Sequence, residues 1–254
     1  MNARPAAERA VTLVRTIAKW DMRSAVRHGL VTALALLAIA CGPAPPPAER
    51  ADVRAFRAKV ALNPIALDGD PYAPDAQPSA ASDDGAVCAI RYDADHVHYR
   101  LATKPDANAA RRDGFIVTHL GACGTCSTLQ DLAVYLARPD LTTPVRRCAA
   151  FGLTRARTLA CLRGLGFSAA CAATWYYDAM NTRRACGRVC VVSWLSREPS
   201  NRPDGRLNDC LQCDEDRSGA VFKRVAGRTR RNSGIRSSID RPGQEVAALV
   251  HDYY

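Results

Sequence analysis

Two cysteines, Cys123 and Cys126, stand where a predicted strand over residues 115–120 runs into a predicted helix. A thiol at the start of a helix lies close to the partial positive charge of the helix N-terminus, which favours the thiolate and lowers the thiol pKa. Such a pair can exchange a disulfide with a substrate, with Cys123 as the nucleophile and Cys126 as the resolving thiol. The same spacing also suits zinc ligands or two structural half-cystines.

Residues 115–136, read as strand, Cys-Gly-Thr-Cys turn and helix, resemble the active-site corner of thioredoxins. The resemblance implies a thiol–disulfide oxidoreductase that uses Cys123 and Cys126. The chain after this corner departs from that family, because it is predicted to be helical and holds seven more cysteines where thioredoxins continue with strands. A structural role for the two cysteines is therefore the favoured interpretation, and the oxidoreductase is the alternative.

The chain has eleven cysteines, of which ten follow residue 86. In an oxidising compartment an even number of cysteines predicts disulfides, here up to five, and spacing alone does not give their connectivity. The predicted half-cystines are Cys88, Cys123, Cys126, Cys148, Cys161, Cys171, Cys186, Cys190, Cys210 and Cys213.

The remaining cysteine, Cys41, directly follows an uncharged apolar run over residues 29–39, which is itself preceded by Arg23 and Arg27. A basic segment followed by a short apolar run is typical of a signal peptide, and the run is shorter than the roughly 20 residues that a membrane span needs. The sequence Leu-Ala-Ile-Ala-Cys at 37–41 resembles the lipobox of bacterial lipoproteins. The resemblance implies cleavage before Cys41, acylation of Cys41 and a membrane anchor.

In the lipoproteins that this segment resembles, an Asp after the acylated cysteine retains the protein at the inner membrane. Gly42 therefore implies the outer membrane, with the domain on its periplasmic or surface face. Residues 1–40 are taken as the signal peptide, and Met22 is a second candidate for the translation start, because it lies directly before Arg23. Residues 41–85, which are rich in Pro and Ala, are expected to form a tether.

The chain carries a net charge of +10, and the signal peptide accounts for part of it. Most of the remaining excess lies between residues 217 and 241. A solvated basic face, or salt bridges to the acidic loop just upstream, is the favoured interpretation of this charge run. An anion site is the alternative, because planar guanidinium groups suit carboxylate, phosphate or sulfate. An extracytoplasmic location excludes a nucleic-acid partner. The predicted anion-binding residues are Arg228, Arg230, Arg231 and Asn232.

Weaker candidates for chemistry are scattered over the domain. His96 and His98 share one face of a predicted strand, and with His119 and His251 they could bind a metal. An acidic loop could bind calcium, and a hydrolase could use His119 with Asp131 or Asp214 as acid and base. None of these sets has the spacing of a known site, so we expect no metal and no cofactor. The acidic residues of the loop are Asp204, Asp209, Asp214, Glu215 and Asp216.

The expected fold is an α+β, mainly helical, disulfide-rich domain over residues 86–254 with a small N-terminal β-hairpin or sheet. Alternating apolar residues predict strands at 86–92, 96–102 and 115–120, and helical spacing predicts helices at 127–138, 144–150, 155–165 and 168–180. One further helix is expected at 48–62.

Three motifs, at residues 123–127, 207–215 and 226–234, resemble uncharacterised secreted cysteine-rich proteins, to which no activity is attached. The predicted function is a lipid-anchored, extracytoplasmic binding or structural domain for an anionic ligand or an envelope protein.

Overall fold

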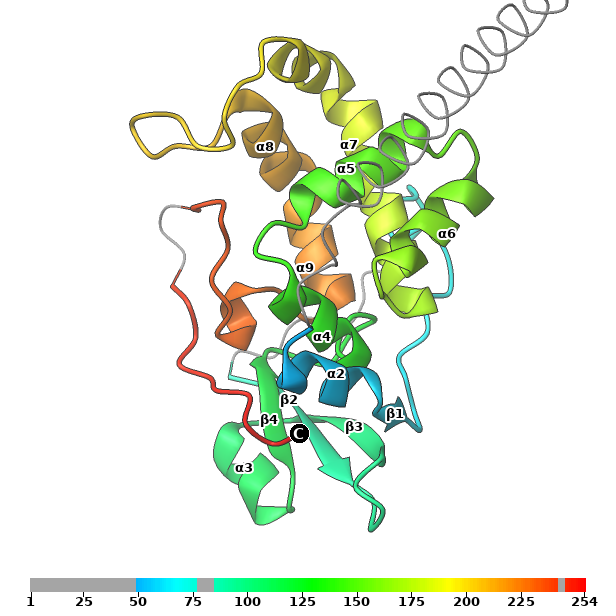
Figure 1. Cartoon of the computed structure of the whole chain (residues 1–254), viewed down its shortest axis with the longest axis vertical. Coiled ribbons are helices and arrows are strands. Elements are labelled where there is room, and N and C mark those ends of the chain that lie inside the picture. Colours follow the sequence, from blue (N-terminus) through cyan, green and yellow to red (C-terminus); the bar gives the residue numbers. More distant parts are fainter. Residues whose placement is uncertain (1–48, 77–84, 242–244) are drawn as a thin grey trace, which may run out of the picture. The chain divides into compact units, whose positions relative to one another are not determined.

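The computed structural model describes residues 49–76, 85–241 and 245–254, which form one compact unit. The predicted signal peptide and Cys41 lie outside the described residues. Four strands form a mixed sheet in the order β1-β3-β2-β4, in which β2 is antiparallel to both of its neighbours and β1 is parallel to β3 (Figure 1). The strands are β1 (Val60–Ala61), β2 (Val87–Tyr92), β3 (His98–Lys104) and β4 (Ile116–Leu120).

The hairpin β2–β3 forms where the sequence predicts it. Its turn is closed by Asp95, whose Oδ1 accepts hydrogen bonds from the backbone N–H groups of Val97 and His98 at 2.8 and 2.9 Å. His96 takes a positive φ of 54° in this turn. The local chemistry of an Asp-rich turn between two alternating segments therefore suffices to predict the hairpin.

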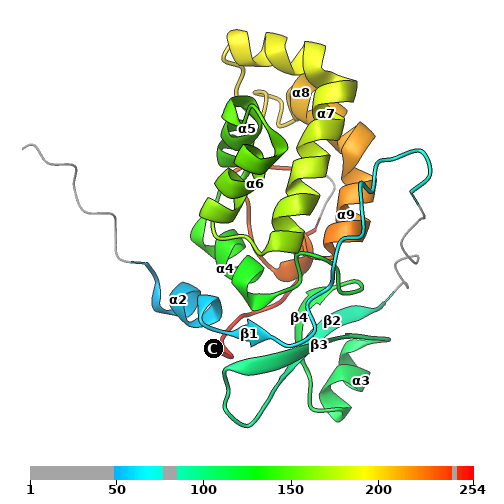
Figure 2. The same cartoon turned by 90° about the vertical axis from the view of Figure 1, so that its right-hand side faces the viewer.

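Helices occupy the rest of the unit, so the α+β, mainly helical class is confirmed. Figure 2 shows α5 to α9 gathered at one end and the sheet with α3 at the other. The helix predicted at 168–180 runs on to Leu195. The α-helices are α2 (Ala51–Arg57), α3 (Ala107–Arg112), α4 (Leu129–Ala137), α5 (Thr142–Phe151), α6 (Arg155–Gly164), α7 (Ala169–Leu195), α8 (Asp209–Asp214) and α9 (Ala220–Ala226).

Helix α4 separates the two main clusters of the core. Its residues Leu129 and Leu132 pack with the sheet and α2, while Val134 and Tyr135 pack with α5, α6 and α7. The capping residue is Thr128, whose hydroxyl accepts from the N–H of Asp131, so the helix begins two residues after the predicted start at 127. None of the helices in the described part of the chain has the length and apolar character that a membrane span requires.

The segment predicted to be a tether contributes to the core, which corrects the expected boundary at residue 86. Val53 and Phe56 of α2 are buried, and the ring of Phe56 lies 5.4 Å from that of Tyr253 at the other end of the chain. The helix expected at 48–62 ends at Arg57, and Val60 then joins the sheet. The alternation of apolar and charged residues in so short a segment could not reveal a partner at the C-terminus.

Five disulfides pair the ten cysteines, with S–S distances near 2.0 Å. Two of them join the Cys123–Cys126 turn to β2 and to α7, one joins α5 to α6, and two join α7 to α8. Such a density of disulfides is typical of an extracytoplasmic protein, because cytosolic thiols are kept reduced. The pairs are Cys88–Cys123, Cys126–Cys171, Cys148–Cys161, Cys186–Cys213 and Cys190–Cys210.

Phe56→Ala should lower the free energy of unfolding by about 3–5 kcal/mol, because it empties a fully buried site between α2 and the C-terminal residues. Ile65→Ala, at a side chain that is 38% exposed, should change it by no more than about 0.5 kcal/mol. Urea denaturation with the disulfides intact measures both values. If the Phe56 variant were as stable as the control, residues 49–62 would not contribute to the core and would belong to the tether.

Candidate functional site

Two motifs that the sequence singles out, the Cys-Gly-Thr-Cys turn and the Ala-Gly-Arg segment, fold against each other. The backbone N–H groups of Thr125 and Cys126 donate to the carbonyl oxygens of Val225 and Ala226 at 3.0 and 2.9 Å. A Cβ on Gly124 would lie 2.4 Å from the Val225 oxygen, so only glycine fits there. We call this contact the motif junction, residues 123–127 against residues 225–228.

Gly227 is required on the other side of the motif junction for two reasons. Its φ is +70°, which L-residues with a side chain rarely adopt, and an added Cβ would lie 2.4 Å from the Gly124 nitrogen. The two glycines therefore allow two backbones to approach more closely than side chains permit. This close packing explains why each motif has a glycine at that position.

The guanidinium of Arg228 is fully buried beneath the motif junction. Its Nε donates to the carbonyl oxygen of Cys126, Nη1 to Thr118 and to the Ser233 hydroxyl, and Nη2 to Ser127, each at 3.1 Å. Burial lowers the pKa of Arg228 from its ordinary value. The side chain connects β4, the Cys123–Cys126 turn and the C-terminal segment, and it has no surface for an anion.

The other predicted anion-binding residues also serve the fold, which corrects the expected anion site. Arg230 donates to the carbonyl oxygens of Tyr135 at 2.9 Å and of Arg138, at the C-terminal end of α4. A cation is favourable there because the last carbonyl groups of a helix lack partners within it. Arg231 donates to the carbonyl oxygen of Arg241 at 2.8 Å.

Asn232 completes this correction. Its Nδ2 donates to the carbonyl oxygens of Leu120 and Gly227 at 2.8 Å, and its Oδ1 accepts from the backbone N–H of Thr229 at 2.7 Å. A run of arginines in a sequence favours a solvated face. Here Arg228 and Arg230 instead donate to backbone carbonyl groups of β4, of the Cys123–Cys126 turn and of the end of α4. Their own segment has one short 3₁₀ turn, Arg231–Ser233.

Cys123 and Cys126 do not have the arrangement of a redox pair. Each is bonded to a different partner, Cys88 and Cys171, and Cys126 is fully buried. Helix α4 begins at Leu129, so neither sulfur lies at the helix N-terminus as the thioredoxin resemblance implies. The geometry of the turn serves two structural disulfides.

His119 and Ser127 form a buried pair that the sequence did not predict. The Nε2 of His119 lies 2.7 Å from the Ser127 hydroxyl, and its Nδ1 lies 2.9 Å from the Leu120 carbonyl oxygen. Burial, together with the charge of Arg228, lowers the pKa of His119 well below its usual value, so the ring is neutral at pH 7. Both residues are inaccessible to solvent, which makes the pair part of the core rather than an acid–base centre.

Asp131, another proposed member of a hydrolase site, has other hydrogen-bond partners than His119. Its carboxylate accepts from the N–H and the hydroxyl of Ser168 at 2.8 Å, which ties α4 to the start of α7, and it also accepts from the Thr128 hydroxyl. Burial raises the pKa of Asp131 to about 6, although these hydrogen bonds act in the opposite direction. The residue therefore fastens two helices.

Three acidic side chains, Asp178, Asp214 and Glu215, lie near one another where α7 meets the π-helical turn Glu215–Gly219. Asp178 accepts from the Tyr72 hydroxyl at 2.8 Å, and Asp214 accepts from Thr182. Burial, with the nearby charge of Asp214, raises the pKa of Asp178 to about 8. Sequence analysis missed Asp178, although it lies seven residues after Cys171 and thus on the same, buried face of α7.

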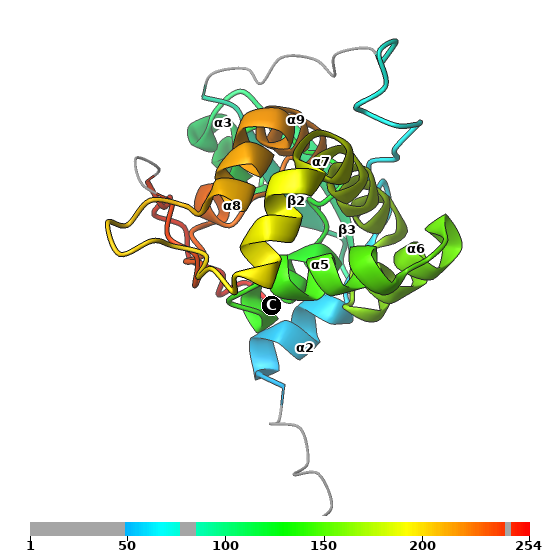
Figure 3. The same cartoon turned by 90° about the horizontal axis from the view of Figure 1, so that it is seen from above.

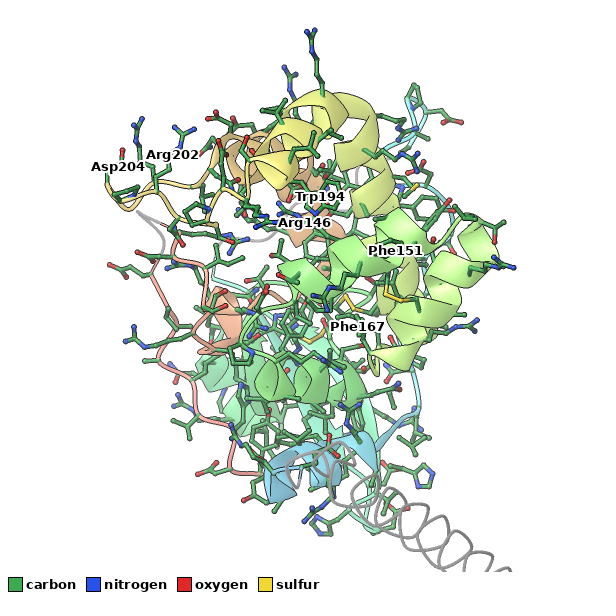
Figure 4. All side chains as sticks on the ribbon, turned by 45° about the horizontal axis from the view of Figure 1, so that its top comes forward. Arg146, Phe151, Phe167, Trp194, Arg202 and Asp204 are labelled. Atoms are coloured by element: carbon green, nitrogen blue, oxygen red, sulfur yellow. A yellow bond between two sulfur atoms is a disulfide. The ribbon has the colours of Figure 1, made fainter. Side chains whose placement is uncertain are left out.

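The remaining candidates pair locally. Asp204 pairs with Arg206, and Asp209 pairs with Arg202 on the same loop, where Figure 4 labels Arg202 and Asp204. The Nδ1 of His98 lies 2.5 Å from Asp95. Within the described ranges, no group of three or more His, Cys, Asp or Glu side chains is placed to hold a metal ion.

Arg228→Met should destabilise the protein by about 3–5 kcal/mol or prevent folding, because it leaves three buried carbonyl groups without a donor. Arg236→Met, at an exposed arginine of the same segment, is the matched control and should leave the melting temperature unchanged. Arg228→Lys keeps the charge but lacks the planar fork, and it should fall between the two. An Arg228→Met variant that melts normally but binds heparin more weakly would restore the anion site.

Asp178 should make stability depend on pH. Its folded pKa lies above the ordinary value, so between about pH 4 and pH 8 the folded state holds a proton that the unfolded chain releases. The free energy of unfolding should therefore fall by a few kcal/mol as the pH rises through this window, because each unit of pKa difference between the folded and unfolded states corresponds to about 1.4 kcal/mol. Asp178→Asn should flatten that fall, whereas Asp75→Asn, at an exposed carboxylate, should not. Equal slopes in all three proteins would contradict this assignment.

The comparisons with known proteins add one family. Residues 155–249 match the model of a family of unknown function (DUF8771). The matched region includes α6, α7 and α8, both disulfides between α7 and α8, and the arginine segment. No curated protein and no solved structure matches the chain.

Proposed function

We propose that this protein is a lipid-anchored binding or structural domain of the bacterial cell envelope and that it performs no catalysis. The observation that carries the proposal is that the side chains predicted to do chemistry are occupied by structural bonds. The two cysteines of the turn are in separate disulfides, and Arg228, His119 and Asp131 are buried and bonded to neighbouring protein groups. These residues build a rigid unit.

The anchor is Cys41, on the lipobox resemblance of residues 37–41. The folded unit begins at Glu49, so the chain between the lipid and the domain spans at most about 28 Å when fully extended. This is much shorter than a tether that ends at residue 85. The domain is therefore proposed to lie directly against the membrane that holds the lipid.

The outer membrane is the proposed location, because Gly42 follows Cys41 where an Asp would retain a lipoprotein at the inner membrane. Two or three acyl chains hold a protein stably, since each buried methylene contributes roughly 0.8 kcal/mol. Five disulfides suit this oxidising compartment.

Cys41→Ala should abolish incorporation of labelled palmitate and release the protein from the membrane fraction. Gly42→Asp is the matched variant: it should keep the label but move the protein from the outer to the inner membrane in a sucrose gradient. Labelling and fractionation of the Cys41 variant that equal those of the wild type would refute the anchor.

A further inference from the structure

The C-terminal turns of α7 expose a cluster of large apolar side chains. Trp194 is 75% exposed, Leu195 68%, Val192 56% and Val191 54%. These four lie within five consecutive residues, whereas most of the other exposed apolar residues in the described part of the chain are scattered singly or in pairs. We call residues 188–197 the α7 tip. A contiguous apolar patch on a soluble surface marks a contact with a partner or a membrane.

Two disulfides hold the α7 tip in this orientation. Cys186 and Cys190 bond to Cys213 and Cys210 of α8, and Ser193 is buried on the same face of the helix. Figure 3 shows α8 beside the last turns of α7. The opposite face is therefore turned outward by covalent bonds, and the apolar residues cannot fold inward to be covered.

The outward face combines arginines with apolar residues. Arg184, Arg188, Val191 and Leu195 recur at spacings of four, three and four, which places them in one row along the helix. Arg183 and Arg197 are exposed as well. No Asp or Glu occurs between Asp178 and Glu198, so this stretch of the chain is basic. Arg184 lies 3.8 Å from the carboxylate of Asp70, and the Arg184 side chain is largely exposed.

The row suits the boundary of a lipid bilayer. Seven residues separate Leu195 from Arg188, which is about 10 Å along the helix axis. Apolar side chains at the end of the helix can enter the acyl region while the arginines remain at the level of anionic headgroups, and Trp is favoured at that boundary. A second copy docked through the same patch would bring the arginines of both copies together, which disfavours a symmetric dimer.

We infer that the α7 tip docks on an anionic phospholipid surface. The inference deepens the proposed function, because the lipid on Cys41 would hold the domain beside that surface. Figure 2 shows α2, where the folded unit begins, at the lower left and the C-terminal end of α7 at the upper left. Lipid anchor and α7 tip would then fix the orientation of the domain through two separate contacts.

The test uses residues 49–254, which contain the whole described core and all five disulfides and lack both the lipid and the signal peptide. Vesicles of phosphatidylglycerol with phosphatidylethanolamine should bind this fragment on sedimentation, and vesicles of phosphatidylcholine should bind it at least about tenfold less. Binding should weaken in 0.5 M salt, about three times physiological ionic strength. The fluorescence of Trp194 should shift to shorter wavelength on binding.

Variants locate the contact. Trp194→Ser with Leu195→Ser, and separately Arg184→Gln with Arg188→Gln, should each weaken binding at least about tenfold, since one basic residue near a charged surface contributes roughly fivefold. Phe151→Ser with Leu153→Ser is the matched control at an exposed apolar pair elsewhere and should bind normally. Trp194 and Phe151 are labelled in Figure 4. Intact mass about 10 Da below that of the reduced fragment shows that each variant keeps five disulfides.

Failure to bind the anionic vesicles, equal binding to both vesicle types, or equal loss in the control pair would overturn the inference. A dimer in sedimentation velocity that Trp194→Ser with Leu195→Ser dissolves, without vesicle binding, would identify a second copy as the occupant instead. The outcome is independent of the anchor, because this fragment has no Cys41 and the palmitate assay does not involve the α7 tip.

Discussion

The buried guanidinium of Arg228 is the interaction on which the rest of the unit depends. It bonds to the carbonyl oxygens of Thr118 in the middle of β4 and of Cys126 and Ser127 in the turn that follows. One planar group with five donors satisfies several acceptors at once, which water cannot do in a closed core. Burial lowers the pKa of His119 and keeps that ring neutral, and the positive charge of Arg228 beside it acts in the same direction.

The motif junction depends on this arginine in a second way. Gly124 and Gly227 permit contact between two backbones. Arg228 follows Gly227 in the chain and bonds across that contact to the carbonyl oxygen of Cys126. Cys123 and Cys126 then reach in opposite directions, to β2 and to α7. The turn, the sheet and the long helix are thereby joined at one point. Residue types that often take part in chemistry therefore serve the structure here.

The C-terminal end of α7 is held in place by other interactions. Polar groups are paired around Asp178 and Asp214 in its middle, and beyond them the helix carries two disulfides on one face and unpartnered apolar residues on the other. Covalent bonds replace the apolar packing that would otherwise hold a helix end in place. The exposed face of the α7 tip is consequently free to meet a partner. Function, in this view, belongs to a surface and not to a cleft.

The sequence by itself determined the features that depend on neighbours along the chain. The hairpin around Asp95, the strand at 116–120, α4, α5, α6 and the first part of α7 follow from alternation, helical spacing and turn residues, and the even number of cysteines predicted up to five disulfides. Only the tertiary structure decided which cysteines pair, since that depends on distances between elements far apart in sequence. It also decided that Phe56 enters the core, because its partner Tyr253 lies at the other end of the chain. The arginine segment is the sharpest case: a charge run predicts a solvated face from local pattern alone, yet Arg228 is buried because the carbonyl groups that need it come from residues more than a hundred positions away.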